Sequence, residues 1–268
     1  MKRKNIDVHA HIFPGKIRDK AVASIGHFYD IHMDAKGSPD DLLQQGNKIG
    51  TVAYVVHSVA TLPRQVQHIN DFISQQMQEH KEFIGYATLH PFMEDVEGEI
   101  ERAIELGLKG IKIHPDFQQF DIDDEAAMYM YEKLEGRLPV ICHMGDEVKR
   151  YSAPKKLAKV IEAFPDLKII AAHMGGYSEW EDAEKYVIGK NVWVDTSSTL
   201  FALAPEKVVD LIHKHGVDRV LFGTDYPMWR PDEELERFMK MDLTEEEREK
   251  ILWKNAAEFL DLKIDEEE

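Results

Sequence analysis

The chain has 268 residues, of which 43% are hydrophobic and 31% are charged. A formal net charge of −17 at pH 7 makes nucleic acids and anionic membrane surfaces poor partners. The single cysteine, Cys142, excludes an internal disulfide and suits a reducing, cytoplasmic location, with its thiol packed as a small hydrophobe. Length and composition predict one folded domain over residues 1–268, long enough for a single α/β barrel and without a membrane-spanning segment.

Eight short segments rich in Val, Ile and Leu alternate with polar stretches along the whole chain. Parallel strands that are buried on both faces have this apolar character. The predicted strands are Asn5–Phe13, Thr51–Val59, Phe83–His90, Lys109–His114, Leu138–Met144, Leu167–His173, Val192–Thr196 and Arg219–Asp225.

The stretches between these strands carry apolar residues at helical spacing. The stretch Pro14–Pro39, after the first strand, is instead expected to be a loop over the barrel mouth that could act as a lid. The predicted helices are Pro63–His80, Val96–Leu106, Asp124–Leu134, Pro154–Phe164, Glu179–Ile188, Pro205–His215, Asp232–Met241 and Thr244–Leu260.

The alternation of strands and helices implies a parallel sheet with right-handed crossovers. Eight units favour a closed (β/α)8 TIM barrel over an open doubly wound sheet, and no Gly-x-Gly-x-x-Gly follows the first strand. Thr244–Leu260 is an extra C-terminal helix that begins with a capping box, Thr244 to Glu247. It is expected to close the bottom of the barrel or to pack on its side.

The first strand contains the pattern Asp7-Val8-His9-Ala10-His11. Residues two apart on a strand face the same way, so all three polar side chains are expected to point into the barrel. His213 and His215 have the same spacing, but they lie on a predicted helix, where this spacing directs the rings apart. They are therefore interpreted as ordinary surface or helix-end residues.

Three further strands also end with residues that bind metal ions. His143 ends the fifth strand, His173 the sixth and Asp225 the eighth. Histidine and carboxylate at the C-terminal ends of several strands are what a metal site at the mouth of a barrel requires. Together with the first strand they predict such a site, because these groups would be costly to bury together without an ion.

Five motifs carry a resemblance to a known group of proteins, and they span nearly the whole chain. The chain resembles the amidohydrolase superfamily, and within it the amidohydrolase-related group that contains aminocarboxymuconate semialdehyde decarboxylase and resorcylate-type decarboxylases. The motifs are Asp-x-His-x-His at Asp7–His11, Gly110-Ile111-Lys112-Ile113-His114-Pro115, His143, His173-Met174-Gly175-Gly176 and Gly223-Thr224-Asp225-Tyr226-Pro227.

The resemblance implies one catalytic divalent metal ion, usually zinc, bound by His9, His11, His143 and Asp225. It also implies that His173 lies beside a metal-bound water as general base or acid. Imidazoles and a carboxylate suit Zn²⁺, with Mn²⁺ possible, and the ion would lower the pKa of its water to about 7. Asp225 or His173 could take the proton.

Other residues near the strand ends are each compatible with two roles. Lys112 is either a carboxylated bridge between two ions, as in other branches of the superfamily, or a buried cation that pairs with Asp7 or a substrate carboxylate. His114 is expected to be structural first and a substrate contact second. Arg230, just after Asp225, is equally compatible with an anion clamp and a solvated loop cation.

The remaining polar and aromatic candidates have mostly structural interpretations. Arg64, Lys149 and Arg150 are interpreted as solvated loop cations, and His57 and His90 as packed, hydrogen-bonded histidines. Aromatic residues that could form an apolar wall of the pocket are Phe28, Tyr29, Trp180 and Trp229.

These residues support two reactions on a small-molecule substrate. The first is hydrolysis of an amide, ester or lactone by metal-activated water, and the alternative is non-oxidative decarboxylation of an aromatic or enol acid. We expect a hydrolase, because no arginine pair is evident and the chain is short for the decarboxylases it resembles. A ligand-storing barrel is disfavoured because all five rim residues are present, and a homodimer is possible.

Overall fold

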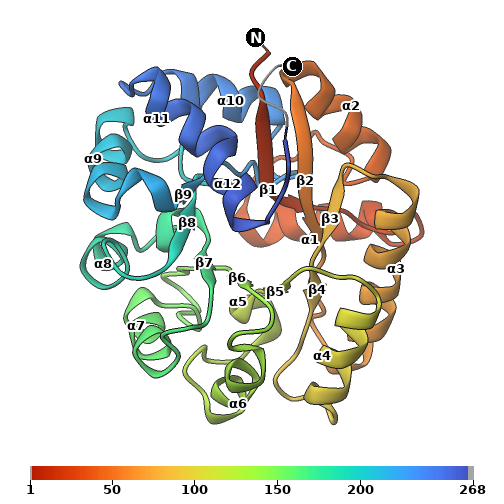
Figure 1. Cartoon of the computed structure of the whole chain (residues 1–268). Coiled ribbons are helices and arrows are strands. Elements are labelled where there is room, and N and C mark those ends of the chain that lie inside the picture. Colours follow the sequence, from red (N-terminus) through yellow and green to blue (C-terminus); the bar gives the residue numbers. More distant parts are fainter. Residues whose placement is uncertain (1, 265–268) are drawn as a thin grey trace.

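Residues 2–264, which the computed structural model describes, form an α/β TIM barrel with a ring of parallel strands inside a ring of helices (Figure 1). Each predicted strand has an observed counterpart. The strands are β1 (Asn5–His11), β2 (Thr51–His57), β3 (Phe83–Gly85), β4 (Ala87–Thr88), β5 (Ile111–Ile113), β6 (Val140–Cys142), β7 (Ile169–Ala171), β8 (Trp193–Asp195) and β9 (Val220–Leu221).

The barrel has eight strand positions because the predicted third strand is interrupted at Tyr86. β1, β2 and β3 pair in that order, and β4 to β9 pair in sequence. The Tyr86 amide donates to the Val56 carbonyl (2.9 Å), which joins the two sheets. The ring closes where the Val8 amide donates to the Phe222 carbonyl (3.0 Å) and the Asp225 amide to the His9 carbonyl (2.8 Å).

The strands from β5 onward are shorter than predicted, at two or three residues each. The predicted ligands His143 and Asp225, and the predicted proton carrier His173, therefore lie beyond the ends of their strands. His173 begins a short 3-10 turn, and both it and Asp225 have positive φ, at 61° and 58°. Apolar composition predicted the strands, but these turns end them earlier.

The helices at the predicted positions are confirmed, with ends that shift by a few residues. Short 3-10 turns cover Pro63–Gln65, His173–Gly175 and Val217–Arg219. The helices are α1 (Arg18–Tyr29), α2 (Pro39–Ile49), α3 (Val66–Glu79), α4 (Val96–Glu105), α5 (Pro115–Gln118), α6 (Glu125–Leu134), α7 (Pro154–Ala163), α8 (Trp180–Tyr186), α9 (Pro205–His215), α10 (Pro231–Met239), α11 (Glu245–Glu249) and α12 (Asn255–Phe259).

The prediction of a loop over Pro14–Pro39 is wrong in part, because α1 occupies the middle of this stretch. None of the α1 residues is fully buried, so the helix carries no continuous core stripe. The helix α2 was not predicted either. Its start has a recognisable signal, since Ser38 Oγ accepts from the Asp41 amide (3.3 Å) and Pro39 occupies the first helical position.

The predicted C-terminal helix is present, with a π-helical turn at Lys250–Lys254 between α11 and α12. Its capping box is confirmed, because Thr244 Oγ1 accepts from the Glu247 amide while the Glu247 carboxylate accepts from the Thr244 amide. Ala256 and Ala257 share a buried apolar cluster with Ile6 of β1. The helix thus closes the bottom of the barrel.

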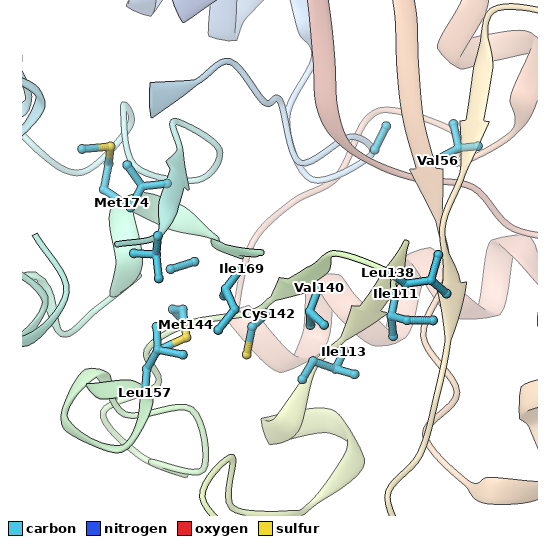
Figure 2. Packing of buried hydrophobic residues seen from close by; sticks show 14 of the residues in the cluster. Val56, Ile111, Ile113, Leu138, Val140, Cys142, Met144, Leu157, Ile169 and Met174 are labelled. Atoms are coloured by element: carbon cyan, nitrogen blue, oxygen red, sulfur yellow. The ribbon is translucent and has the colours of Figure 1, made fainter. Parts of the chain in front are cut away.

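Alternate residues of the strands face two apolar layers. Ile113, Val140 and Cys142 lie in the layer between strands and helices (Figure 2), which confirms Cys142 as a buried packing residue. Ile141 and Ile170 belong to the second cluster, with Ile6 and Val8. This alternation leaves the other end of the barrel free for polar side chains.

A substitution in the Gly110–Pro115 motif tests the packing of the interrupted strand. A Cβ atom at Gly110 would lie 2.3 Å from Cε2 of the buried Tyr86 ring. Gly110→Ala should therefore destabilise the fold by about 1–3 kcal/mol, measured by urea unfolding. Gly15→Ala is the matched control, since no atom lies within 4 Å of its Cβ, and equal unfolding midpoints for both variants would contradict this packing.

Candidate metal centre and substrate cavity

A cavity of about 300 Å³ opens at the C-terminal end of the barrel strands. Its inner end is polar and its walls are largely apolar. The polar lining includes His11, His114, His143, His173 and Asp225. The apolar lining includes Phe13, Ala21, Ile25, Phe28, Met33, Val59, Phe117, Pro227 and Met228.

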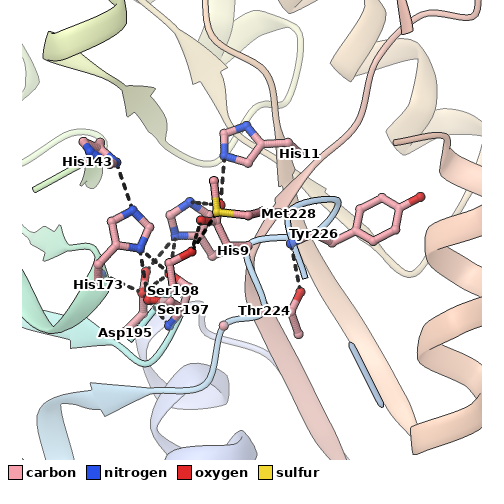
Figure 3. Close-up of polar contacts among 12 residues, drawn as sticks. His9, His11, His143, His173, Asp195, Ser197, Ser198, Thr224, Tyr226 and Met228 are labelled. Carbon is pink, nitrogen blue, oxygen red and sulfur yellow. Dashed lines mark hydrogen bonds and ion pairs between the residues drawn. The ribbon is translucent and has the colours of Figure 1, made fainter. Parts of the chain in front are cut away.

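Two histidines of β1, His9 and His11, lie close together (Figure 3), and the Asp225 carboxylate contacts both. Asp225 Oδ1 lies 3.4 Å from Nε2 of both His9 and His11. One potential ligand atom each from His9, His173 and Asp225 lies within 4.8 Å of the others, as is also true for His9, His11 and His57. This arrangement can hold a metal ion.

His143 lies next to this group and is linked to it through His173. The distance from His143 Nδ1 to His173 Nε2 is 2.9 Å, and the His143 ring stacks on His114 with centroids 3.7 Å apart. His143 also belongs to a separate potential ligand group with His114 and Asp116. Its Nε2 atom is buried and has no hydrogen-bond partner among the described residues.

Asp195 orients two of these histidines, a role that the sequence reasoning missed. Its Oδ2 lies 2.9 Å from His9 Nδ1, and its Oδ1 accepts from the His173 amide (3.0 Å) and the Ser197 amide (3.1 Å). Burial raises the pKa of Asp195, but His9 and His173 outweigh this effect and lower the pKa to about 2. The polar run from Asp195 to Ser198, directly at the end of a strand, is the signal that could have revealed it.

The Asp225 carboxylate is held from its other side by a serine. Ser198 Oγ donates to Asp225 Oδ2 (2.5 Å) and accepts from Trp229 Nε1 (2.9 Å). Burial raises the pKa of Asp225, but the neighbouring histidines, led by His9, hold it well below its usual range. The carboxylate is thus fixed in its ionised form.

Asp7 is not among the residues that line the cavity, and it joins β1 to the segment after β9. It accepts from the Thr224 amide (3.0 Å), from Thr224 Oγ1 (2.6 Å) and from the His9 amide (3.1 Å). The register of β1 against β2 shifts between Asp7 and Ala10. Burial raises its pKa to about 7.

Lys112 contacts His9 rather than the predicted partner Asp7. It is fully buried on β5, with Nζ 2.9 Å from His9 Nε2. Burial lowers its pKa to about 8. Lys112 thus faces the same His9 nitrogen as Asp225.

His114 has the structural role expected of it, and it also lines the cavity. Its Nδ1 accepts from the Phe117 amide (3.3 Å) and caps α5, while Nε2 lies 2.9 Å from the Tyr29 hydroxyl at the cavity wall. Phe28 and Tyr29 line the cavity as predicted, but Trp180 and Trp229 are not among the lining residues.

His57 is buried as predicted, but neither of its ring nitrogens has a hydrogen-bond partner among the described residues. Its ring lies 4.4 Å from that of His11 and 5.0 Å from that of His9. The expectation of a hydrogen-bonded histidine is therefore wrong here. His90 does have a partner, since its Nδ1 accepts from the Phe92 amide (3.3 Å).

The structure does not support Arg230 as an anion clamp. Its guanidinium forms a two-atom ion pair with Asp232 (2.7 and 3.0 Å) and is absent from the cavity lining. The second histidine pair lies in the last turn of α9, in keeping with the prediction of surface or helix-end residues. His213 is exposed and pairs with Glu247, but His215 is buried and contacts the Val192 carbonyl (3.0 Å).

Curated relatives of the chain are decarboxylases. The gamma-resorcylate decarboxylase of Polaromonas sp. strain JS666 is 24% identical over 255 residues, covering 72% of this chain and 75% of that enzyme. The 2-amino-3-carboxymuconate-6-semialdehyde decarboxylase of Dictyostelium discoideum is 26% identical over 247 residues, covering 73% and 66%. The decarboxylase orsB of Emericella nidulans is 29% identical over 133 residues, and the match spans only 39% of that protein.

Solved structures of similar fold cover nearly the whole chain. A dihydroxybenzoic acid decarboxylase from Polaromonas sp. JS666, with bound manganese and the inhibitor 2-nitroresorcinol, has a TM-score of 0.74 at 18% identity and 99% coverage of both chains. The 5-carboxyvanillate decarboxylase of Sphingomonas paucimobilis has a TM-score of 0.73 at 17% identity, covering 97% of this chain and 99% of the other.

The prediction of a hydrolase is wrong, because the curated relatives are named as decarboxylases and the alternative reaction fits them better. The family assignment is independent of that correction. The amidohydrolase family profile matches residues 6–262, so the chain belongs to this family.

Proposed function

We propose that this protein is a metal-dependent, non-oxidative decarboxylase of a small aromatic acid. The observation that carries the proposal is the polarity of the cavity, with imidazoles and one carboxylate at the inner end and apolar walls around the rest. Such a cavity suits a flat apolar ring whose acid group faces the inner end. The decarboxylase names of the curated relatives support the same reaction.

One divalent ion, Mn²⁺ or Zn²⁺, would be held by His9, His11, His143 and Asp225. The donor set fits such an ion, because Asp225 stays ionised beside the imidazoles of His9 and His11. His143 adjoins them through His173, and its Nε2 has no hydrogen-bond partner among the described residues. A bound ion would supply positive charge that holds the substrate's oxygen atoms. We infer that Lys112 lies beside this site as a neighbouring cation, with Nζ 2.9 Å from His9 Nε2.

The chain's own residues would bind the ring and move the proton. Cleavage of the bond between ring and carboxyl carbons releases CO₂ and leaves the electron pair on the ring carbon, which must take up one proton. His173 lines the cavity and is the candidate to deliver it. The Ser197 carbonyl, 3.0 Å from His173 Nδ1, and the Trp180 indole, which donates to the His173 carbonyl, keep this residue in position.

The direct test is to incubate the purified protein with Mn²⁺ or Zn²⁺ and 2,6-dihydroxybenzoate or 2-hydroxybenzoate, while CO₂ and the phenolic product are measured together. We expect CO₂ and the phenolic product to form in equal amounts. Elemental analysis of the purified protein will show whether it carries Mn²⁺ or Zn²⁺. Acid release from aromatic esters or lactones, without CO₂ from any acid, would contradict the proposal.

Asp195→Asn should lower metal affinity by about 10- to 100-fold, because the carboxylate that orients His9 through Nδ1 is lost. Affinity can be measured by competition with a chelating dye. Asp210→Asn is the matched control, since Asp210 forms an ion pair with Lys214 on α9, where neither side chain is buried. If both variants bind metal equally well, Asp195 has no role in orienting a ligand.

A further inference from the structure

The outer part of the cavity differs in chemistry from its inner end. Helix α1 and the residues after it contribute Ile25, Phe28 and Met33 to the apolar lining, and Val59, Phe117 and Met228 also belong to it. Within the described part of the chain, the lining contains neither lysine nor arginine. Its only negative group is Asp225, at the inner end.

The polar groups of the outer wall offer almost no partner for a second charge on the ligand. The Tyr29 hydroxyl already lies 2.9 Å from His114 Nε2. The remaining polar lining residues outside the inner cluster are Ser24 and Thr61, which are neutral. An ionised group placed here would lose water without gaining a counter-ion, and that loss is costly.

Two features favour an apolar substituent in this space. Phe28 is 38% exposed, and α1 has no fully buried residue, so an apolar ligand would cover side chains that now contact water. The rings of Phe28, Phe117 and His114 also brace one another, with centroids 4.7 Å and 3.8 Å apart. They form a firm wall against which a flat ligand can pack.

We propose that the substrate carries a single carboxylate and an uncharged, apolar substituent that packs against α1, and that aromatic diacids are excluded. This inference rests on the proposed decarboxylase function. It makes Ile25 and Phe28 the residues that determine specificity. A cavity of about 300 Å³ restricts the substrate to one ring with a modest substituent, since pockets for larger ligands reach about 1,000 Å³.

The test compares two acids of nearly equal shape, 2-hydroxy-4-isopropylbenzoate and 2-hydroxyterephthalate, on the Mn²⁺-loaded protein. Calorimetry should show that the isopropyl acid binds at least about tenfold more tightly than the diacid. Equal or tighter binding of the diacid would overturn the inference. It would also be overturned if neither acid bound.

A variant that adds a cation to the wall keeps the test specific. Ile25→Arg should reverse the preference towards the diacid, whereas Ile104→Arg, on the exposed surface of α4, should leave it unchanged. A preference that stays the same in Ile25→Arg would contradict the role of α1.

Turnover of the same two acids separates this inference from the proposed reaction. Tight binding of the isopropyl acid without CO₂ from any monoacid would refute the reaction and leave the specificity intact. Preferential release of CO₂ from the diacid would refute the specificity and leave the reaction intact.

Discussion

His173→Gln is expected to lower kcat by about 10²–10⁴-fold while the protein keeps its full content of metal. The imidazole lines the cavity, with Nε2 2.9 Å from His143 Nδ1 and Nδ1 3.0 Å from the Ser197 carbonyl. Glutamine can keep a polar contact at this place, but it cannot exchange a proton near neutral pH. The substitution should therefore slow the chemical step and spare the proposed ligands.

The measurement is kcat from CO₂ release, with metal content determined on the same sample. His213→Gln is the matched control, because it makes the same change on the surface, where His213 pairs with Glu247. A kcat within a few-fold of the wild-type value would show that another group moves the proton. Loss of the metal from His173→Gln would instead make His173 a ligand.

Asp225→Asn is expected to have the largest effect on metal binding, with at least about a 100-fold loss of affinity and no measurable turnover. Asp225 Oδ1 lies 3.4 Å from both His9 and His11, and its negative charge is the one carboxylate charge among the proposed ligands. An amide of the same shape can accept from Ser198 but brings no charge to the ion. The affinity for Mn²⁺ should therefore fall although the cavity keeps its shape.

Calorimetric titration with Mn²⁺ checks this prediction, and thermal unfolding of the metal-free protein shows that the fold is intact. The control is Asp218→Asn, since Asp218 is exposed and pairs with Lys250. Unchanged Mn²⁺ affinity in Asp225→Asn would remove Asp225 from the ligand set and, with it, the proposed one-ion site.

Apolar composition was enough to predict the barrel, because each strand is buried on both faces and its residues therefore carry a strong signal. The same argument explains what was missed. Helix α1 buries no residue completely, so its sequence lacks the periodic stripe that identified α3 or α9. The ends of the short strands depend on positive φ values at residues such as His173, which composition does not indicate.

The proposed ligands could be located because each follows an apolar run, which places them all at the same end of the barrel. The residues that hold them carry a weaker signal, since Asp195 reaches His9 only through the closed ring of strands. The sequence also does not show whether an isolated polar residue is buried or which partner it has. His215 ends its helix as expected but is buried against a carbonyl, and His57 was expected to have a hydrogen-bond partner but has none among the described residues.

The seam between β1 and β9 has a consequence for how the protein matures. His9 comes from the first strand and Asp225 follows the last, and the amide of Asp225 donates to the carbonyl of His9 across that seam. The amide and hydroxyl of Thr224 donate to Asp7 and link the same two segments. During synthesis the first histidines must therefore wait for almost the entire chain to emerge before their carboxylate partner arrives. Binding of the proposed ion would then be a late event, tied to the final closure of the ring.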